Sequence, residues 1–545
     1  MITVELRAEV EEWIALDPDP TTRSLLQAWL DTGNESELRL AFAGFLQFGT
    51  AGLRGPIGPG PSRMNRAVVS RAAAGIASYM QERGLTSVVI GRDARHGSED
   101  FTFESAAIFS GAGMQVLVLP RPLPTPVLAF AVRDLHVDCG IMVTASHNPP
   151  QDNGYKVYLG GVIDGINYNA SQIVSPADEQ ISALIAQKKF ELNRGTEWTI
   201  LNDDVLDRYV TRTALLAPTY FDVKAVYTAM HGVGTETVER TFAQANFDAP
   251  ILVSAQTAPD PNFPTVAFPN PEEPGAIDLS LEVARAHSAD VVIANDPDAD
   301  RCAAAIEDQG IWRMLTGDEL GSLFGDYLAN SAPEQYKDRC FANSIVSSSL
   351  LSKIAKKHGI EFHETLTGFK WLAKLKNLGF GYEEAIGYSV DPQTVNDKDG
   401  VSAAIMLARI AGELKEQGSS ISEYLQKINA EYGFHKTVQI SIRVVDLSSI
   451  GRTLNLIRQS QPDEIAGLKV LRFDDLLKPD GALPPTDGLR LYLERDVRVI
   501  IRPSGTEPKV KCYIEVVVPT DSKVDRLHAE SIVAQLSPAL RGYFV

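Results

Sequence analysis

Cysteine is scarce in this sequence, with four residues among 545. They stand far apart, form no CxxC pair and lack the Cys/His spacing typical of zinc ligands: Cys139, Cys302, Cys340 and Cys512. This pattern argues against a disulfide-built secreted domain and against a structural zinc site. We therefore expect four reduced thiols inside a cytoplasmic protein.

Long apolar runs are also missing. The best candidate for a membrane span, residues 116–132, is interrupted by Arg121 and four prolines, whereas a spanning helix needs about 20 consecutive apolar residues. Residues 1–20 are acidic and amphipathic, without the basic start and apolar centre of a signal peptide. The sequence therefore predicts neither export nor a membrane partner.

Positive charge is in deficit, because 51 Lys and Arg face 70 Asp and Glu and the net charge is −19. Such a charge repels nucleic acid and anionic lipid at long range. We expect no nucleic-acid partner. An anionic ligand has to be bound by arginines and lysines that are grouped locally.

Short β-branched runs alternate with helical patterns after residue 70. Runs such as SVVIGRD (87–93) and DCGIMV (138–143) flank a helical pattern at 99–114. This order predicts βαβ units and mostly parallel sheets. It restarts near residue 224 and again after residue 316, whereas the segment after 434 is richer in strands and predicts a smaller α+β domain.

The length of the chain is too great for one core and suggests three or four domains. The changes of pattern predict these boundaries: 1–215, 216–315, 316–433 and 434–545. In open α/β sheets, ligands bind beyond the carboxyl ends of the strands. The loops that follow strands are therefore the places to look for chemistry.

The loop TASHNPPQDNGYK, residues 144–156, follows one of these strands. Pro149 and Pro150 block a helix and keep the loop extended, so we expect the Ser146 hydroxyl to be exposed at the strand end. A serine placed there can act as a nucleophile or carry a phosphoryl group. A plain turn, with His147 capping the strand, fits the loop as well.

A second loop, ANDPDADR, places Asp296, Asp298 and Asp300 after the apolar run 291–294. This spacing points three carboxylates the same way, which suits Mg²⁺, a cation that prefers oxygen ligands. An EF-hand is disfavoured, because Arg301 occupies the position that requires glycine and the flanking runs resemble strands. A solvated acidic turn is the remaining alternative.

Two further loops are suited to anions and sugars. RPSGTEPK, residues 502–509, joins two strand-like runs and combines Arg502 with hydroxyl donors and a glycine, which favours a phosphate-binding loop; a plain hairpin is the alternative. In GYEEAIGY, residues 381–388, Glu383 and Glu384 follow an apolar run and can accept hydrogen bonds from sugar hydroxyls. Exposed acids explain this last pattern equally well.

Six segments, taken together and in this order, closely resemble the α-D-phosphohexomutase family of phosphoglucomutases and phosphomannomutases. They are FGTAGLRG (48–55), TASHNP (144–149), DPDADR (296–301), TLTGFK (365–370), YEEAIG (382–387) and RPSGTEPK (502–509). The resemblance covers nearly the whole chain. It implies three similar α/β domains with mixed sheets and a C-terminal α+β domain around a central cleft.

The resemblance also implies roles for residues of these motifs. Ser146 carries the phosphoryl group and, with the three aspartates, completes the Mg²⁺ site. The remaining expected catalytic residues are His147, Lys156, Arg301 and Arg54. The expected substrate-binding residues are Thr367, Gly368, Lys370, Glu383, Ala385, Arg502, Ser504, Gly505 and Thr506. The general base stays open between His147 and Lys156.

The activity implied by the resemblance is the interconversion of glucose 1-phosphate and glucose 6-phosphate through a 1,6-bisphosphate, which would also act as activator. Ala385 departs from the family pattern, in which this position is often serine, and so removes one hydroxyl contact to the sugar. Phosphomannomutase, phosphopentomutase and bisphosphate synthase activities are alternatives, as is a non-catalytic sugar-phosphate sensor. We expect a small-molecule phosphosugar as the partner and a monomer or homodimer.

Overall fold

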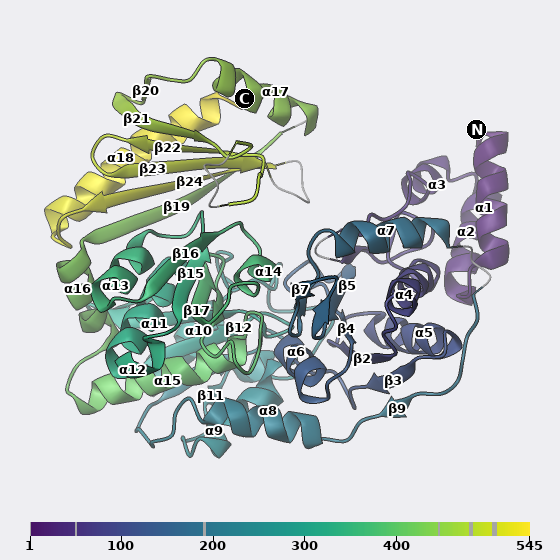
Figure 1. Cartoon of the computed structure of the whole chain (residues 1–545), viewed down its shortest axis with the longest axis horizontal. Helices are drawn as coiled ribbons and strands as arrows, with labels where there is room; N and C mark the ends of the chain where they lie inside the picture. The colour runs from purple at the N-terminus through teal and green to yellow at the C-terminus, as the bar shows by residue number, and fades with distance from the viewer. Residues whose placement is uncertain are drawn as a thin grey trace. The chain divides into compact units, whose positions relative to one another are not determined.

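The computed structural model forms two compact units (Figure 1). Unit 1 comprises Met1–Met314 and Gly387–Glu416, and unit 2 comprises Leu315–Ile386 and Gln417–Val545. The structure describes residues 2–49, 52–188, 192–444, 447–478, 483–503 and 509–544. Residues 400–416, expected in the third domain, belong to unit 1, and the four domain boundaries stay a prediction.

The first sheet of unit 1 is parallel in its centre and antiparallel at one side. Its strand order is β1-β5-β4-β2-β3-β9, with β8 paired to β5. Strands β2, β3, β4 and β9 are parallel, and β5 and β1 run antiparallel to their neighbours. The bounds are β1 Leu53–Pro56, β2 Ser87–Arg92, β3 Gln115–Val118, β4 Cys139–Val143, β5 Asp152–Leu159, β8 Ser171–Gln172 and β9 Thr199–Ile200.

Helices cover both faces of this sheet because its central strands carry apolar side chains on both faces. Val88 and Ile90 share one core with helices α4 and α5. Gly91 belongs to the opposite face of the strand, where a Cβ would lie 3.2 Å from Leu128 of α6. Gly75 of α4 allows close packing on α7, since a Cβ there would lie 2.4 Å from Ile185. The bounds are α4 Arg66–Gln81, α5 Ser98–Gly111, α6 Thr125–Asp134, α7 Ala177–Gln187 and α8 Asp204–Ala214.

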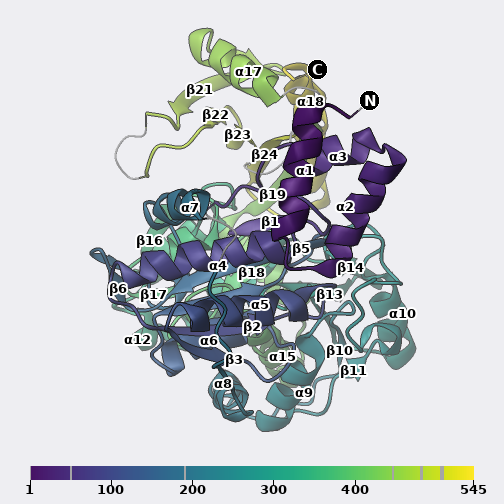
Figure 2. The ribbon, with the colours of Figure 1, turned by 90° about the vertical axis from the view of Figure 1, so that its right-hand side faces the viewer.

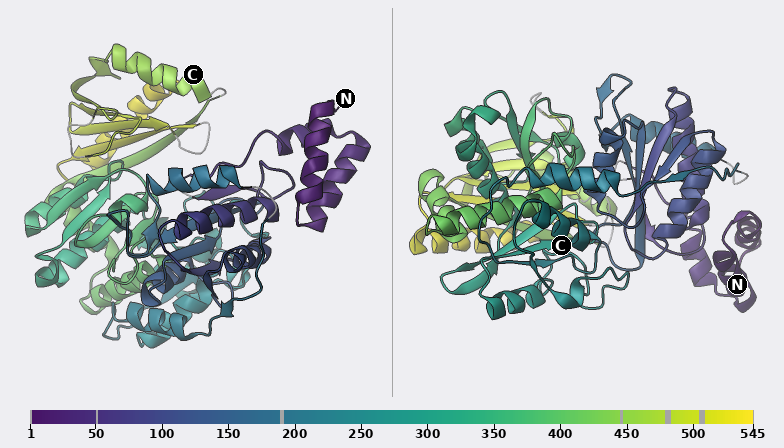
Figure 3. Two further views of the ribbon diagram at one scale, coloured as in Figure 1. Left: turned by 45° about the vertical axis from the view of Figure 1, so that its right-hand side comes forward. Right: turned by 90° about the horizontal axis from the view of Figure 1, so that it is seen from below.

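Three helices at the N-terminus, which the sequence patterns did not reveal, cluster together (Figures 2 and 3). They are α1 Val4–Leu16, α2 Pro20–Thr32 and α3 Glu35–Ala41. Each begins at a side-chain cap, from Thr3, Asp19 and Asn34 respectively, which satisfies an otherwise unpaired backbone N–H. Their apolar residues join the core of the first sheet.

The second sheet of unit 1 has the order β11-β10-β12-β13-β14. Strands β11, β10 and β12 are parallel, whereas β13 and β14 are antiparallel. The strands are β10 Ala225–Thr228, β11 Ile251–Leu252, β12 Val291–Asn295, β13 Cys302–Asp308 and β14 Ile311–Met314. Unit 1 also contains α9 Gly234–Gln244, α10 Asp278–His287, α15 Gly400–Glu416, the 3-10 helix Ser254–Gln256, β6 Val162–Ile163, β7 Ile166–Asn167 and β18 Gly387–Ser389.

Unit 2 combines a parallel α/β layer with an antiparallel sheet. In the former, β15 pairs in parallel with β16 and β17; these strands are β15 Cys340–Ser344, β16 Glu361–Thr365 and β17 Leu378–Glu383. Its helices are α11 Gly317–Ser331, α12 Pro333–Tyr336, α13 Leu350–His358, α14 Phe369–Leu372 and α16 Ile421–Tyr432.

The antiparallel sheet has the order β19-β24-β23-β22-β21-β20. Helices α17 and α18 share its core through Leu454 and Leu536, both fully buried. The elements are β19 Phe434–Arg443, β20 Glu464–Ile465, β21 Leu468–Asp475, β22 Leu489–Leu493, β23 Val497–Pro503, β24 Lys509–Val518, α17 Leu447–Gln459 and α18 Lys523–Gly542. This confirms the predicted α+β character of the C-terminal segment.

The four cysteines are free and buried, as expected of reduced thiols. Burial raises the pKa of the Cys340 thiol to about 11 and that of Cys512 to about 12. Among the helices that the structure describes, none is long and apolar enough to cross a membrane.

Asp318, at the start of α11, is a buried carboxyl whose protonation affects stability. Its Oδ1 accepts hydrogen bonds from the Ser348 N–H (2.6 Å) and the Tyr382 hydroxyl (3.0 Å). Burial, and to a smaller degree the charge of Glu384, raises the pKa of Asp318 to about 7. The folded state therefore binds a proton that the unfolded state loses near pH 4.

The stability contributed by this proton is complete below about pH 4 and is lost as the pH rises through about 7. We expect Asp318→Asn to raise the free energy of unfolding of the transition that includes unit 2 at pH 8. The gain should be on the order of 1–3 kcal/mol, shrinking towards pH 4. Urea unfolding between pH 4 and pH 8 measures the difference in free energy of unfolding between the variant and the wild type, and Asp338→Asn, at an exposed residue, is the control. A difference that does not change with pH would refute the assignment.

Candidate active site

Ser146 follows strand β4 in a left-handed backbone conformation, with φ = 52°. Its N–H donates to Thr144 Oγ1 (2.9 Å), and its own Oγ donates to Asp296 Oδ2 (2.7 Å). The expectation of an exposed hydroxyl is wrong, since Ser146 is 2% exposed. The contact with Asp296 joins positions 150 residues apart in the chain, so a local sequence pattern does not reveal it.

The loop after Ser146 is also less extended than we expected. The Asn148 N–H donates to the Ala145 carbonyl and the Asp152 N–H donates to the Pro149 carbonyl, each at 3.0 Å. These two bonds fold the loop into successive turns. The prolines do exclude a helix, but they do not keep the chain straight.

The three aspartates converge as predicted. Ligand oxygens of Asp296, Asp298 and Asp300 lie within 4.8 Å of one another, and all three residues are fully buried. Burial excludes a solvated acidic turn. An EF-hand is also excluded, because the loop connects β12 and β13, which pair as antiparallel strands.

Cationic side chains balance part of this negative charge. Lys156 Nζ, on β5, lies 2.6 Å from Asp298 Oδ2 and 2.6 Å from Asp300 Oδ2. Lys398 Nζ lies 2.7 Å from the same oxygen of Asp300. The Thr125 hydroxyl donates to Asp298 Oδ2 at 2.6 Å. One oxygen of each of these two carboxylates is thus satisfied.

The other oxygen, Oδ1, of Asp298 and of Asp300 is buried and has no hydrogen-bond partner within the described part of the chain. Arg301 Nε lies 3.9 Å from Asp300 Oδ1, an ion-pair distance too long for a hydrogen bond. Buried carboxylate oxygens without a hydrogen bond are costly unless a cation binds them. Three clustered carboxylates form a donor set typical of Mg²⁺. The residues present therefore fit the predicted cation.

The charges within the cluster shift the pKa values of Asp298 and Asp296 in opposite directions. Burial by itself raises the pKa of Asp298, but Lys156 lowers it, and the net pKa lies below the usual range. Asp296 has no such lysine, so burial and the neighbouring Asp298 raise its pKa well above the usual value. Three carboxylates in one buried site cannot all ionise easily without a further cation.

His147, Arg54 and Arg301 lie around the serine. His147 Nδ1 is 3.2 Å from Ser146 Oγ. Burial, followed by the charges of Arg301 and Arg54, lowers the pKa of His147 well below its usual value, which favours the neutral imidazole. Arg54 donates to Asn148 Oδ1 (3.2 Å), and the Arg301 N–H donates to Asp296 Oδ1 (3.1 Å).

Lys398 and Thr125 were missed by the sequence analysis. Lys398 precedes α15, and the Asp397 carboxylate beside it accepts a hydrogen bond from Tyr158 (2.9 Å), which anchors this loop to β5. Burial lowers the pKa of Lys398, but Asp300 and Asp397 outweigh this and raise it overall. The only local signal is the lysine between two aspartates in NDKDG.

Unit 2 contains the nine expected substrate-binding residues, and hydrogen bonds join four of them in two pairs. Glu383 Oε1 accepts a hydrogen bond from the Gly368 N–H (2.6 Å), and Arg502 donates to the Thr367 hydroxyl. Gly368 has φ = 114°, which favours glycine. Lys370 lies beside Trp371.

The neighbouring Glu384 accepts hydrogen bonds from the hydroxyls of Ser344 (3.1 Å) and Ser347 (3.2 Å), and Ala385 follows it in the chain. The predicted Ser504, Gly505 and Thr506 lie outside the described residues. Strands β23 and β24, which flank them in the chain, pair as antiparallel strands.

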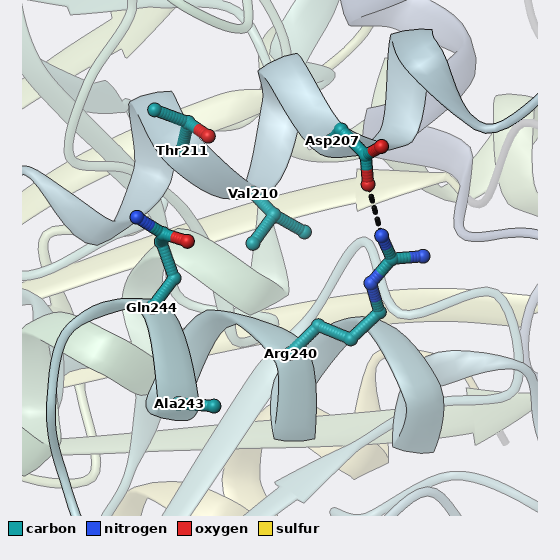
Figure 4. Close-up of a pocket in the computed structure, with 6 residues that line it drawn as sticks. All are labelled: Asp207, Val210, Thr211, Arg240, Ala243 and Gln244. Atoms are coloured by element: carbon teal, nitrogen blue, oxygen red, sulfur yellow. Dashed lines mark hydrogen bonds and ion pairs between the residues drawn. The ribbon is translucent and has the colours of Figure 1, made fainter.

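A surface hollow of about 350 Å³ lies elsewhere in unit 1, between α8 and α9 (Figure 4). Its rim includes an ion pair between Asp207 and Arg240. It contains none of the expected catalytic residues. This hollow is not the candidate active site.

The chain belongs to the phosphoglucomutase/phosphomannomutase family, a family of sugar-phosphate mutases. Models of its four domains match in order: the α/β/α domains I, II and III at residues 46–191, 209–310 and 316–432, and the C-terminal domain at 455–532. The mixed α/β architecture expected from the resemblance is confirmed.

Relatives from distant organisms cover most of the chain. It is 48% identical to a probable phosphomannomutase of Haemophilus influenzae, over 86% of this chain and 96% of that protein. It is 36% identical to a human phosphopentomutase, over 94% and 92%, and 30% identical to a human glucose 1,6-bisphosphate synthase, over 97% and 92%. A crystal structure described as a putative phosphomannomutase from Thermus thermophilus has the same fold, with a TM-score of 0.71, 23% identity and coverage of 92% and 99%.

The metal assignment predicts that Asp298→Asn weakens Mg²⁺ binding by at least about tenfold, because it removes a charge from the oxygen donor set. Calorimetric titration of the purified protein with MgCl₂ measures this. Asp207→Asn, at the surface hollow, serves as the control and should bind Mg²⁺ as the wild type does. Equal affinity in all three proteins would exclude the aspartate cluster as the metal site.

Proposed function

We propose that this chain is a phosphosugar mutase that uses a phosphoserine at Ser146. The observation that carries the proposal is the buried contact of Ser146 Oγ with Asp296, inside a cluster of carboxylates and lysines. Phosphoryl transfer depends mainly on positioning and charge neutralisation. A serine held against such a cluster is suited to accept and release a phosphoryl group.

Asp296, Asp298 and Asp300 would hold Mg²⁺, together with an oxygen of the group on Ser146. The bound cation supplies charge neutralisation at the transferring phosphoryl group. Lys156 and Lys398 keep the metal loop in place through their contacts with Asp298 and Asp300. Arg301 and Arg54 add positive charge near the serine.

His147 is the better of the two candidates for the base at the serine. Its Nδ1 lies 3.2 Å from Ser146 Oγ and its lowered pKa favours the neutral imidazole, whereas the Lys156 ammonium is paired with two aspartates. When a sugar bisphosphate returns a phosphoryl group, its P–O bond breaks and a bond from phosphorus to Ser146 Oγ forms. The Ser146 proton, which the hydroxyl otherwise donates to Asp296 Oδ2 at 2.7 Å, passes to His147 Nδ1 and from there to the freed sugar oxygen.

Unit 2 would bind the sugar and the phosphate that is not transferred. Glu383 and the loop at Thr367 and Gly368 are held together by their mutual hydrogen bonds, and Arg502 supplies the charge for phosphate. In the reaction we propose, a sugar 1,6-bisphosphate is both the intermediate and the activator. It turns around between the two phosphoryl transfers.

We propose glucose 1-phosphate as the first substrate, from the resemblance described above. Ribose 1-phosphate is a second candidate, since relatives named phosphopentomutase align along the chain and Ala385 lacks a hydroxyl for a hexose. A panel of the 1-phosphates of glucose, mannose, ribose and deoxyribose, ranked by kcat/KM, decides between them.

Replacement of the serine tests the mechanism. We expect Ser146→Ala to lose at least about 10³-fold in conversion, because the acceptor of the phosphoryl group is removed. Intact mass spectrometry should show one phosphoryl group on the wild type and none on the variant, and Ser254→Ala, an exposed serine, should behave as the wild type.

Conversion that survives in Ser146→Ala would refute the phosphoserine mechanism. Release of sugar bisphosphate, dependent on a donor such as 1,3-bisphosphoglycerate, would indicate a bisphosphate synthase. Binding of sugar phosphate without turnover in the wild type would indicate a sensor.

Arg502→Ala tests the phosphate site. A hydrogen bond to a charged group contributes about 1.5–3 kcal/mol, so KM should rise by about 10- to 100-fold while kcat falls less. Steady-state kinetics measure this, with Arg472→Ala, an exposed arginine of the same unit, as control. A loss of stability with unchanged KM would contradict the assignment.

A further inference from the structure

Arg95 lies in the loop that follows β2 and is almost completely buried, with its side chain 1% exposed. Its guanidinium donates four hydrogen bonds to backbone carbonyls of the serine loop. Nη2 reaches the carbonyls of Ser146 and Asn148, each at 2.6 Å, and Nη1 reaches those of Pro149 (2.8 Å) and Asp152 (3.2 Å). One side chain thus holds the loop from its first turn to its end.

The guanidinium is itself fixed from two directions. Its Nε lies 3.4 Å from Asp93 Oδ2, and its carbon lies 5.0 Å from the centre of the Phe263 ring. Asp93 Oδ1 in turn accepts hydrogen bonds from the Arg95 N–H (3.0 Å) and the Ser98 hydroxyl (2.6 Å). Asp93 and Phe263 therefore fix the orientation of the Arg95 guanidinium independently of its hydrogen bonds to the loop.

The loop needs such support because Ser146 adopts a strained backbone conformation. Ser146 has φ = 52°, a conformation that costs a non-glycine residue about 1–3 kcal/mol and persists only where the surroundings enforce it. The Ser146 carbonyl is one of the four acceptors of Arg95. Arg95 therefore acts on the same residue whose Oγ meets Asp296.

We propose that Arg95 is a positioning residue that holds Ser146 in the left-handed conformation that brings its Oγ to Asp296. This role rests on the proposed phosphoserine function. Arg95 acts through the loop backbone, so its loss should affect transfer at Ser146 more than binding of the sugar phosphate. A misplacement of about 1 Å can cost about 100-fold in rate.

Arg95→Lys tests the proposal, because lysine keeps the charge but lacks the planar fork. Arg409→Lys is the matched control, since Arg409 donates to the carbonyl of Leu216 in another loop of the same unit. With glucose 1-phosphate and glucose 1,6-bisphosphate, we expect kcat to fall about 100-fold and KM to change by less than about threefold. The control should keep both values.

Hydrogen–deuterium exchange gives a readout that does not depend on activity. In Arg95→Lys, the peptide that contains residues 144–153 should exchange about tenfold faster than in the wild type. Peptides from β10 and β12 should be unchanged. If the wild type does not convert glucose 1-phosphate, the proposed substrate fails, while exchange still decides the role of Arg95.

A second variant covers the case in which Arg95→Lys fails to fold. Asp93→Asn combined with Arg95→Met leaves no uncompensated charge in this buried pair, and the wild type is its reference. The double variant should show the same loss of kcat and the same local exchange. The proposal would be overturned if the double variant kept the kcat and the hydrogen–deuterium exchange of the wild type. It would also be overturned if exchange rose equally throughout unit 1.

Discussion

The contact between the Ser146 hydroxyl and Asp296 depends on a balance of buried charge. Three carboxylates within a few ångströms are strongly unfavourable in a protein interior unless cations accompany them. Lys156 and Lys398 supply two positive charges by direct contact. A divalent cation would turn the remaining negative charge into a positive one, which is the environment that a transferring phosphoryl group requires.

The strands around this cluster explain why its parts meet. Ser146 follows β4 and the aspartates follow β12, so both occupy loops at the carboxyl ends of parallel strands, where α/β proteins bind ligands. Lys156 comes from the antiparallel β5 next to β4, and its side chain can reach back to the same place. The mixed character of the sheet is thus part of the site.

The motifs and the alternating elements could be predicted from sequence because they depend on local patterns of apolar, glycine and proline residues. The convergence of the aspartates also followed from their spacing. The burial of Ser146 could not be predicted, since residues distant in the chain, such as Asp296 and Arg95, lie against it. Lys398 and Arg95 were equally hidden, because a single basic residue in a loop has no periodic signal, and the three N-terminal helices were recognised only in the structure.

The burial of all four thiols has a practical consequence for labelling. Alkylating reagents attack the thiolate, and burial makes this form rare at neutral pH. The native chain should therefore be inert to maleimides without any cysteine being removed. Cysteines introduced on the surface of either unit would then carry fluorophores selectively.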